Sequence, residues 1–143
     1  MILLDTNVIS ELIRPQPDAT VAAFLRHQPP QTLFTASVCE AEIRYGLARM
    51  PAGRRRNDLA GRITLFLATA FAGRIVAFDT AAAALYGTIR AAREADGKPI
   101  SVQDAMIAAT ARAYGLSVAT RDGNDFTGCG LEITDPWLQD HEQ

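Results

Sequence analysis

The chain has 143 residues, a formal net charge of −2 and a hydrophobic fraction of 48%, which is typical of a single globular domain spanning residues 1–143. No apolar run approaches the roughly 18 residues of a membrane helix, and the N-terminus lacks the basic segment of a signal sequence. We therefore expect a cytoplasmic protein with no membrane contact. The slight net acidity excludes nucleic-acid binding through a global basic field.

Short apolar runs alternate with helix-like segments along the whole chain. The apolar runs predict strands at residues 1–4, 33–36, 75–78, 116–119 and 131–133. Helical spacing predicts helices after Asp5, from Asp18 to Pro29, and over residues 37–50, 54–72, 80–96 and 101–114. This alternation predicts an α/β fold, with helices on both faces of a mainly parallel sheet of four or five strands.

Polar residues mark the starts of several predicted helices. Asp18 can cap the second helix, and Asp79 precedes its helix as an N-cap, which suffices to explain Asp79. Ser37 begins the third helix, with Glu40 at the spacing of a capping box. Ser101 and Asp104 have the same spacing at the start of the last helix, so a cap is one explanation for Asp104.

Five acidic residues fall where a parallel sheet would gather them. Asp5 follows the first strand, and Asp122 and Asp125 follow the fourth. Asp104 opens a helix that is apolar almost all round, and Glu42 lies at the flank of the apolar arc of its helix. Each has a structural explanation by itself, as a cap, a loop residue or a boundary residue. Together they predict a carboxylate cluster at the carboxyl edge of the sheet.

Such a cluster requires a cation, because unpaired carboxylates repel one another. Oxygen ligands without histidine or cysteine suit Mg²⁺, with Mn²⁺ as the alternative. The two histidines, His27 and His141, fall in a turn and in the tail and are poor catalytic candidates. A metal held by carboxylates activates water and stabilises the charge that develops in phosphodiester hydrolysis.

The order of these motifs resembles the PIN domain. The matching segments are Ile-Leu-Leu-Asp5-Thr-Asn-Val-Ile-Ser, Glu42, Asp104 and Thr120-Arg-Asp122 before Phe126. The closing Asp135-Pro-Trp137 is similar to VapC-type toxins of the FitB-like branch. The likeness covers nearly the whole chain and implies an α/β/α sandwich.

The resemblance also implies a function: a metal-dependent endoribonuclease, the toxin of a type II toxin–antitoxin system. By position, the catalytic quartet is Asp5, Glu42, Asp104 and Asp122. The metal ligands implied for Mg²⁺ are Asp5, Asp104 and Asp122. The supporting residues are Thr6, Asn7, Thr120 and Asp125.

Two acids compete for the last place in the quartet. Many family members carry asparagine at the position of Asp122 and an aspartate three residues later, immediately before phenylalanine. This chain has acids at both Asp122 and Asp125. We favour Asp122 and keep Asp125 as the alternative.

The family likeness further implies a homodimer and a neutralising antitoxin of VapB type, which often directs an arginine toward the acidic site. Operator DNA would be bound only through the antitoxin. Arg54-Arg55-Arg56 could contact RNA phosphates, but such a run is more often a solvated helix start.

The main alternative is a non-catalytic binding or regulatory module of the same fold that acts through its partner complex on DNA. A signalling receiver domain is disfavoured because Lys98 lies outside any apolar run. A haloacid-dehalogenase phosphatase would need a second aspartate where this chain has Asn7.

Overall fold

The computed structural model describes residues 1–138, so His141 and the last five residues of the predicted domain lie outside the described part. The strands are β1 (Ile2–Leu4), β2 (Leu33–Ala36), β3 (Ile75–Val76), β4 (Ser117–Ala119) and β5 (Ile133–Thr134). The helices are α1 (Thr6–Leu12), α2 (Ala19–Arg26), α3 (Ser37–Ala48), α4 (Arg54–Ala70), α5 (Thr80–Ala95) and α6 (Val102–Ala113).

The five strands form one parallel sheet in the order β3-β2-β1-β4-β5, which confirms the predicted α/β fold. β1 is central and pairs with both β2 and β4. Leu3 and Leu4 on β1 and Val118 and Ala119 on β4 are fully buried. Central strands covered on both faces need apolar residues at every position, which explains why these runs do not alternate with polar residues.

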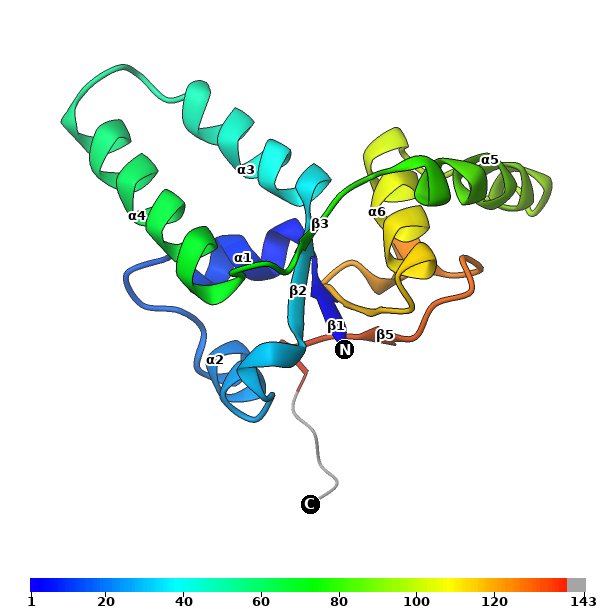
Figure 1. Ribbon diagram of the computed structural model, residues 1–143, viewed down its shortest axis with the longest axis horizontal. Helices are drawn as coiled ribbons and strands as arrows, with labels where there is room; N and C mark the ends of the chain where they lie inside the picture. Colours follow the sequence, from blue (N-terminus) through cyan, green and yellow to red (C-terminus); the bar gives the residue numbers. More distant parts are fainter. Residues whose placement is uncertain (139–143) are drawn as a thin grey trace.

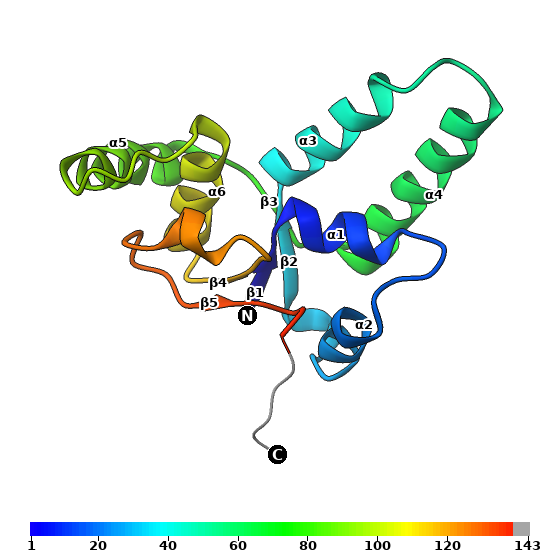
Figure 2. The same ribbon diagram turned by 180° about the vertical axis from the view of Figure 1, so that it is seen from behind.

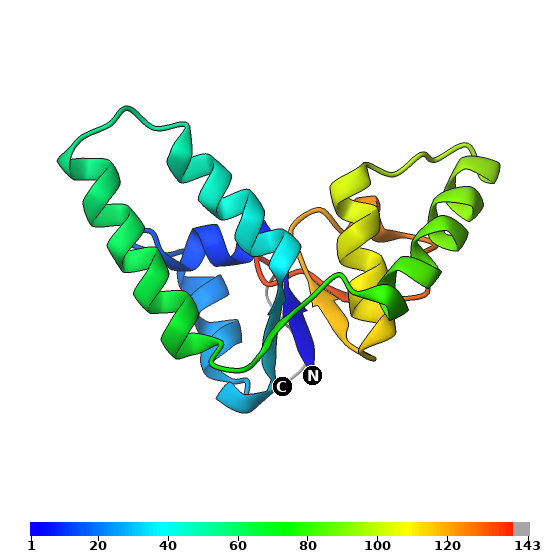
Figure 3. The same cartoon turned by 45° about the horizontal axis from the view of Figure 1, so that its top comes forward.

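Helices lie on both sides of the central strands. Figure 1 shows the α3–α4 hairpin and α1 on one side, and α5 and α6 on the other. The tilted view in Figure 3 shows the α3–α4 and α5–α6 pairs diverging from the strands like the arms of a V. From behind, α6 lies beside β4 (Figure 2), and the two elements are in contact. No helix among residues 1–138 is long and apolar enough to cross a membrane.

The starts of three helices confirm the predicted caps. Asp18 Oδ1 accepts hydrogen bonds from the amides of Thr20 and Val21, at 2.9 and 3.1 Å. Asp79 Oδ1 accepts one from the Ala82 amide at 3.1 Å. Ser101 Oγ accepts the amide of Asp104 at 3.1 Å. Such caps satisfy amides that the helix itself leaves without partners.

The capping box predicted at Ser37 is wrong. β2 passes directly into α3, so Ala36 occupies the cap position and no side chain caps the helix. Glu40 instead forms an ion pair with Arg44, with Oε2 at 2.8 Å from Nε. Ser37 is already helical, and its hydroxyl is therefore one position too late to cap the first amides.

Two strands also differ from prediction. β3 ends at Val76 rather than residue 78, before the turn into the Asp79 cap. β5 begins at Ile133 rather than residue 131, because its pairing with Val118 sets the register. Gly128 and Gly130 turn the preceding loop with φ of +74° and +76°, values that favour glycine.

A buried arginine fastens that loop to the rest of the domain. Arg93 on α5 is only 6% exposed. Its Nε donates to the carbonyl of Lys98 at 2.6 Å, and its Nη1 donates to those of Asp125 and Thr127 at 2.7 and 3.0 Å. The guanidinium therefore donates several hydrogen bonds to backbone carbonyls that helix and strand hydrogen bonds do not satisfy.

We expect Arg93→Met to lower the free energy of unfolding by about 3 kcal/mol, since it removes the hydrogen bonds of a nearly buried, charged donor to three backbone carbonyls. Urea denaturation followed by circular dichroism measures the change. Arg90→Met on the same helix is the control, because the polar contacts of Arg90 within residues 1–138 are with Tyr86 and Glu94 alone; its loss should change the free energy of unfolding much less than that of Arg93. Equal losses for the two variants would contradict the anchoring role of Arg93.

Candidate active site

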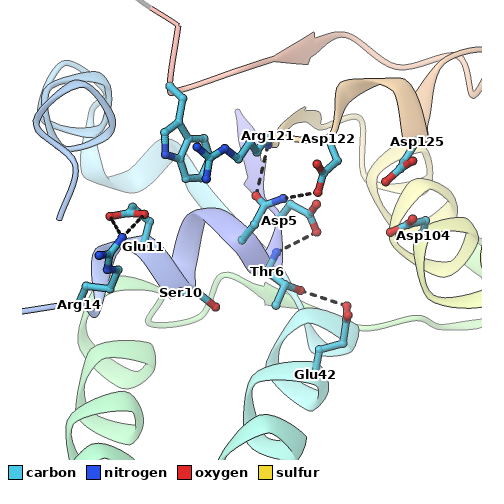
Figure 4. Close-up of a pocket in the computed structure, with 12 residues that line it drawn as sticks. Asp5, Thr6, Ser10, Glu11, Arg14, Glu42, Asp104, Arg121, Asp122 and Asp125 are labelled. Atoms are coloured by element: carbon cyan, nitrogen blue, oxygen red, sulfur yellow. Dashed lines mark hydrogen bonds and ion pairs between the residues drawn. The ribbon is translucent and has the colours of Figure 1, made fainter.

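An open cleft of about 480 Å³ lies at the carboxyl ends of β1 and β4. Six acidic residues line it: Glu11 on α1, and the five acids that the sequence singled out, Asp5, Glu42, Asp104, Asp122 and Asp125. These five come from the end of β1, from α3, from α6 and from the loop after β4 (Figure 4). The structure thus brings together all five acids that the sequence singled out, across more than a hundred residues of chain.

The hydroxyl of Thr120 joins the ends of β1 and β4 beneath the cleft. Its Oγ1 donates to Asp5 Oδ2 at 2.8 Å, and both residues are buried. The same oxygen accepts from Asn7 Nδ2 at 3.3 Å and from the Asp122 amide at 3.1 Å. Asp5 Oδ1 accepts the Thr6 amide at 2.8 Å. These bonds orient the Asp5 carboxylate before any ligand arrives.

Glu42 is half-buried on α3 and is held by α1. Thr6 Oγ1 donates to Glu42 Oε1 at 3.0 Å, which leaves Oε2 without a hydrogen bond among residues 1–138. This contact is the partner that a carboxylate on the flank of an apolar arc requires. The predicted supporting role of Thr6 is therefore an orienting contact to a second acidic residue.

Asp104 combines the two roles that the sequence left open. Its amide is capped by Ser101, as the capping box predicts. Its carboxylate lines the cleft near Asp125, and both lie to the right of Glu42 in Figure 4. A capped backbone amide and a cleft-lining carboxylate therefore occur at one residue, and the catalytic role of Asp104 stays a prediction.

The two acids after β4 are held differently. Asp122 Oδ2 accepts from Asn7 Nδ2 at 3.1 Å, which ties it to α1 and to the Thr120 junction. Asp125 is fixed through its backbone, since its amide donates to the Asp122 carbonyl at 2.9 Å and its carbonyl accepts from Arg93. Its carboxylate makes no hydrogen bond within residues 1–138. Both acids line the cleft, so geometry gives each of them access to a cation.

Burial and crowding raise the pKa of the innermost carboxyl. Loss of solvent raises the pKa of Asp5 above its usual 3.8, and the charges of Glu42 and Asp122 add to the shift. Hydrogen bonds from Thr120 and Thr6 act in the opposite direction. The hydrogen-bond donors thus favour the ionised form of Asp5, whereas burial and the neighbouring charges disfavour it.

The same causes act on two further acids. Burial raises the pKa of Glu42 and of Asp104. The charge of Asp104 adds to the shift at Glu42, and the charges of Asp5, Asp125 and Asp122 add to the shift at Asp104. A cation in the cleft would reverse the repulsive contribution at every one of these groups.

A buried thiol lies near the innermost carboxylate. Cys39 on α3 is fully buried, and burial together with the charge of Asp5 raises the pKa of its thiol to about 12. Cys129 is buried as well, and both cysteines are free thiols.

The residues present fit a hard cation such as Mg²⁺. The donors around the acidic part are carboxylate, hydroxyl and amide oxygens, which such ions prefer. No three acidic, histidine or cysteine side chains among residues 1–138 are placed to hold a metal ion together. Mg²⁺ commonly takes one or two carboxylates and keeps several waters, so a closed cage of three protein ligands is not required.

Sequence reasoning missed the other end of the cleft. Ser10, Glu11, Arg14, Arg121 and Trp137 line it beyond the acids. The signal was present on α1 and just after it, where Asn7, Ser10, Glu11 and Arg14 recur at helical spacing and form a polar stripe. The contribution of Trp137 follows from the path of the chain after β5 and has no sequence pattern that predicts it.

Several residues considered from the sequence do not line the cleft. Asp79 is a cap, as predicted. Arg54–Arg56 begin α4, where Arg56 donates to the Met50 carbonyl at 3.3 Å. His27 is exposed at the end of α2. None of these residues lines the acidic cleft.

Fold and cleft together define a class: a parallel α/β domain with an acidic site beyond the carboxyl ends of its central strands. Residues 2–127 match the PIN domain. The chain is 45% identical over 137 residues to VapC ribonuclease Y4jK of Sinorhizobium fredii, covering 96% of this chain and 98% of the relative. It is 42% identical to toxin FitB of Neisseria gonorrhoeae, with coverages of 96% and 99%.

Solved structures agree with this relationship. FitAcB from Neisseria gonorrhoeae superposes with a TM-score of 0.90 at 41% identity, covering 97% of this chain and 100% of that chain. FitAB bound to an IR36 DNA fragment gives a TM-score of 0.92 at 40% identity, with both chains fully covered. The chain therefore belongs to the PIN-domain family and stands among its VapC- and FitB-like members, as the sequence motifs predict.

The raised carboxyl pKa values predict that ionisation of these acids destabilises the metal-free protein as the pH rises. The folded state binds protons at Asp5, Glu42 and Asp104 more tightly than the unfolded chain, so their contribution to stability is present below the unfolded pKa values of 3.8 to 4.5 and is lost as pH rises through the folded values. In EDTA at pH 7, we expect Asp104→Asn to raise the midpoint of thermal unfolding.

A divalent cation should raise the midpoint of thermal unfolding of the parent, and it should raise the midpoint of Asp104→Asn by a smaller amount. Asp58→Asn, an exposed change on α4, is the matched control and should follow the parent. Differential scanning calorimetry in EDTA and in excess cation measures all three proteins. A metal-free Asp104→Asn protein that is less stable than the parent at pH 7 would show that repulsion does not dominate this cleft.

Proposed function

We propose that this chain is the toxin of a type II toxin–antitoxin system and acts as a metal-dependent endoribonuclease. The observation that carries the proposal is the cleft in which five carboxylates from four segments lie together. Its relatives at 45% and 42% identity are named a VapC ribonuclease and a toxin. Residues 1–143 would act as one PIN domain in the cytoplasm.

The cation is proposed to be Mg²⁺, with Mn²⁺ as an effective substitute. Divalent-metal dependence is general among PIN-domain VapC nucleases, and the oxygen donors of the cleft support a hard ion. Asp5, Asp104 and Asp122 would hold it, directly or through its waters, since no three acidic side chains among residues 1–138 are placed to ligate one ion together. When bound, such an ion lowers the pKa of water and offsets negative charge that develops on the phosphate.

The protein's own residues then have distinct tasks. Thr120 and the Thr6 amide fix Asp5, so that its orientation need not be acquired during binding. Thr6 holds one oxygen of Glu42 and leaves the other to accept a proton from the attacking water. The raised pKa of Glu42 brings it nearer to the operating pH of a general base.

The proposal extends to partners. The relative solved at 40% identity is described as FitAB bound to an IR36 DNA fragment. We propose that a cognate VapB-type antitoxin binds this chain and directs an arginine into the acidic cleft, where a bidentate contact with carboxylates is favourable. Operator DNA would be reached through the antitoxin, and the toxin would form a homodimer.

Cleavage of a panel of structured RNAs by the purified chain tests the activity. We expect fragments with Mg²⁺ or Mn²⁺ and none with EDTA. Asp104→Asn should lower the rate at least about 100-fold, because losing a direct ligand harms a metal site at least as much as losing an outer partner does. Asp58→Asn, purified by the same route, should cleave like the parent.

Equal cleavage by parent and Asp104→Asn would reveal a contaminating nuclease or a misplaced site. A folded parent that binds the cation but cleaves no RNA would favour the non-catalytic module acting on DNA through its partner.

The contest between the two late acids can be decided by paired substitutions. Asp122→Asn and Asp125→Asn remove one charge each while keeping size. Because Asp122 is tied to Asn7 and the Thr120 junction, we expect Asp122→Asn to reduce cleavage about 10- to 100-fold and weaken Mg²⁺ binding, and Asp125→Asn to do so less. Isothermal titration with Mg²⁺ and initial rates give the two readouts. The reverse order would assign the completing role to Asp125.

A further inference from the structure

The cleft is chemically divided. Its acidic part carries the five carboxylates, whereas its other end carries Arg121 and Arg14, the latter paired with Glu11 (Figure 4). The indole of Trp137 lines the same cleft. Nothing in the proposed hydrolysis uses Arg14, Arg121 or Trp137. An RNA strand crossing the acidic part meets strong repulsion between its phosphates and the carboxylates, so the cationic end is where the same strand can be attracted.

Arg121 and Trp137 form a stacked pair. The guanidinium carbon of Arg121 lies 4.7 Å from the centre of the indole ring. No carboxylate among residues 1–138 forms an ion pair with Arg121. Its positive charge is therefore held by an aromatic face rather than by an acid, although several acids lie in the same cleft.

The pair is anchored to the acidic part through the backbone. Arg121 stands between Thr120 and Asp122, and its amide donates to Asn7 Oδ1 at 3.3 Å. The Trp137 amide donates to Asp135 Oδ1 at 2.8 Å, which fixes the turn after β5. The ring thus lies at a defined place beside the carboxylates and not on a free tail.

Arg14 supplies a second cation at the same end. Its Nη1 donates to both oxygens of Glu11, at 3.1 and 3.2 Å, while its side chain stays 64% exposed. Glu11 is nearly buried and also accepts the Asp18 amide at 2.9 Å. One guanidinium nitrogen is therefore anchored, and the others make no hydrogen bond within residues 1–138.

The energies of the two contacts favour replacement of the Arg121 guanidinium by a nucleic-acid base on the Trp137 ring. An exposed cation–π contact contributes about 0.5–1 kcal/mol, whereas stacking of a nucleic-acid base on an aromatic side chain contributes about 1–3 kcal/mol. A base that replaces the guanidinium also frees Arg121 for a bidentate contact with phosphate. Stacking needs a base outside a duplex, since paired bases cover one another.

We propose that Trp137, Arg121 and Arg14 form a nucleotide-binding subsite, in which an unpaired RNA base stacks on Trp137 and the two arginines hold its flanking phosphates. The inference rests on the proposed function, since it takes RNA as the substrate. It adds that the substrate is single-stranded beside the cleaved bond and that this end of the cleft sets the register of cleavage.

The chain contains a single tryptophan, so its fluorescence reports this subsite alone. We would titrate the whole protein with a six-nucleotide single-stranded RNA in EDTA, which prevents metal-dependent cleavage. Saturable quenching of Trp137 is expected. A duplex of the same length and an inorganic polyphosphate should quench much less, because neither offers an unpaired base.

Substitutions separate stacking from charge. Arg121→Gln should weaken binding several-fold and reduce the slope of log affinity against log salt by about 0.7, the value for one phosphate contact on a single strand. Trp137→Ala, followed by anisotropy of labelled RNA, should weaken binding about 10-fold or more, whereas Trp137→Phe should retain most of the affinity.

Arg49→Gln is the matched control. Arg49 also stacks on an aromatic ring, with its guanidinium carbon 5.6 Å from the centre of Tyr45, but the pair lies on and just after α3 outside the cleft. The Arg49→Gln protein should bind the RNA with the same affinity and salt dependence as the parent. Equal effects of Arg49→Gln and Arg121→Gln would overturn the subsite.

The outcomes also separate this inference from the ribonuclease proposal. RNA cleavage without quenching, or quenching that polyphosphate matches, would overturn the subsite while the nuclease stands. Quenching by single-stranded RNA with the predicted changes in the variants, in a protein that cleaves no RNA, would support the subsite and remove the catalytic proposal.

Discussion

The hydroxyl of Thr120 is the interaction on which the acidic cleft depends. It donates to Asp5 and accepts from Asn7 and from the Asp122 amide, so a single oxygen connects the ends of two neighbouring strands. Parallel pairing of β1 with β4 places Leu4 opposite Ala119, and Asp5 and Thr120 are the next residues along each strand. The register of the β1–β4 pairing therefore determines how the Asp5 carboxylate is oriented.

This dependence explains how much the sequence could predict. Strand β2 and the caps at Asp18, Asp79 and Ser101 follow from local patterns, which act within a few residues. The convergence of the acids follows from parallel pairing, which brings the carboxyl ends of strands to one edge. Both kinds of inference use only chain direction and periodicity, and both agree with the structure.

What sequence could not supply is side-chain direction and strand register. The Ser37 cap fails because β2 runs into α3 without an intervening residue, a detail of one residue in the chain path. The start of β5 is set by its partner Val118. Trp137 reaches the cleft only because the chain returns there after β5. These features arise from long-range packing, which local patterns do not encode.

The acidic cleft destabilises the fold around it. Its acids are crowded and partly buried, and their ionised forms are favoured mainly by fixed donors from Thr6, Thr120 and Ser101. Such local conflict is expected where function rather than folding selects the residues. The neighbouring arginine–indole pair keeps a positive charge close by without forming an ion pair with these carboxylates.

The buried thiols have a practical consequence. The Cys39 thiol, with its pKa raised to about 12, stays protonated at neutral pH, and burial also raises the pKa of Cys129. Thiolate is the form that reacts with alkylating reagents and oxidants. Both native cysteines are therefore chemically silent in the folded protein, and a single cysteine introduced at the surface would take up a spectroscopic label selectively with the natural core left intact.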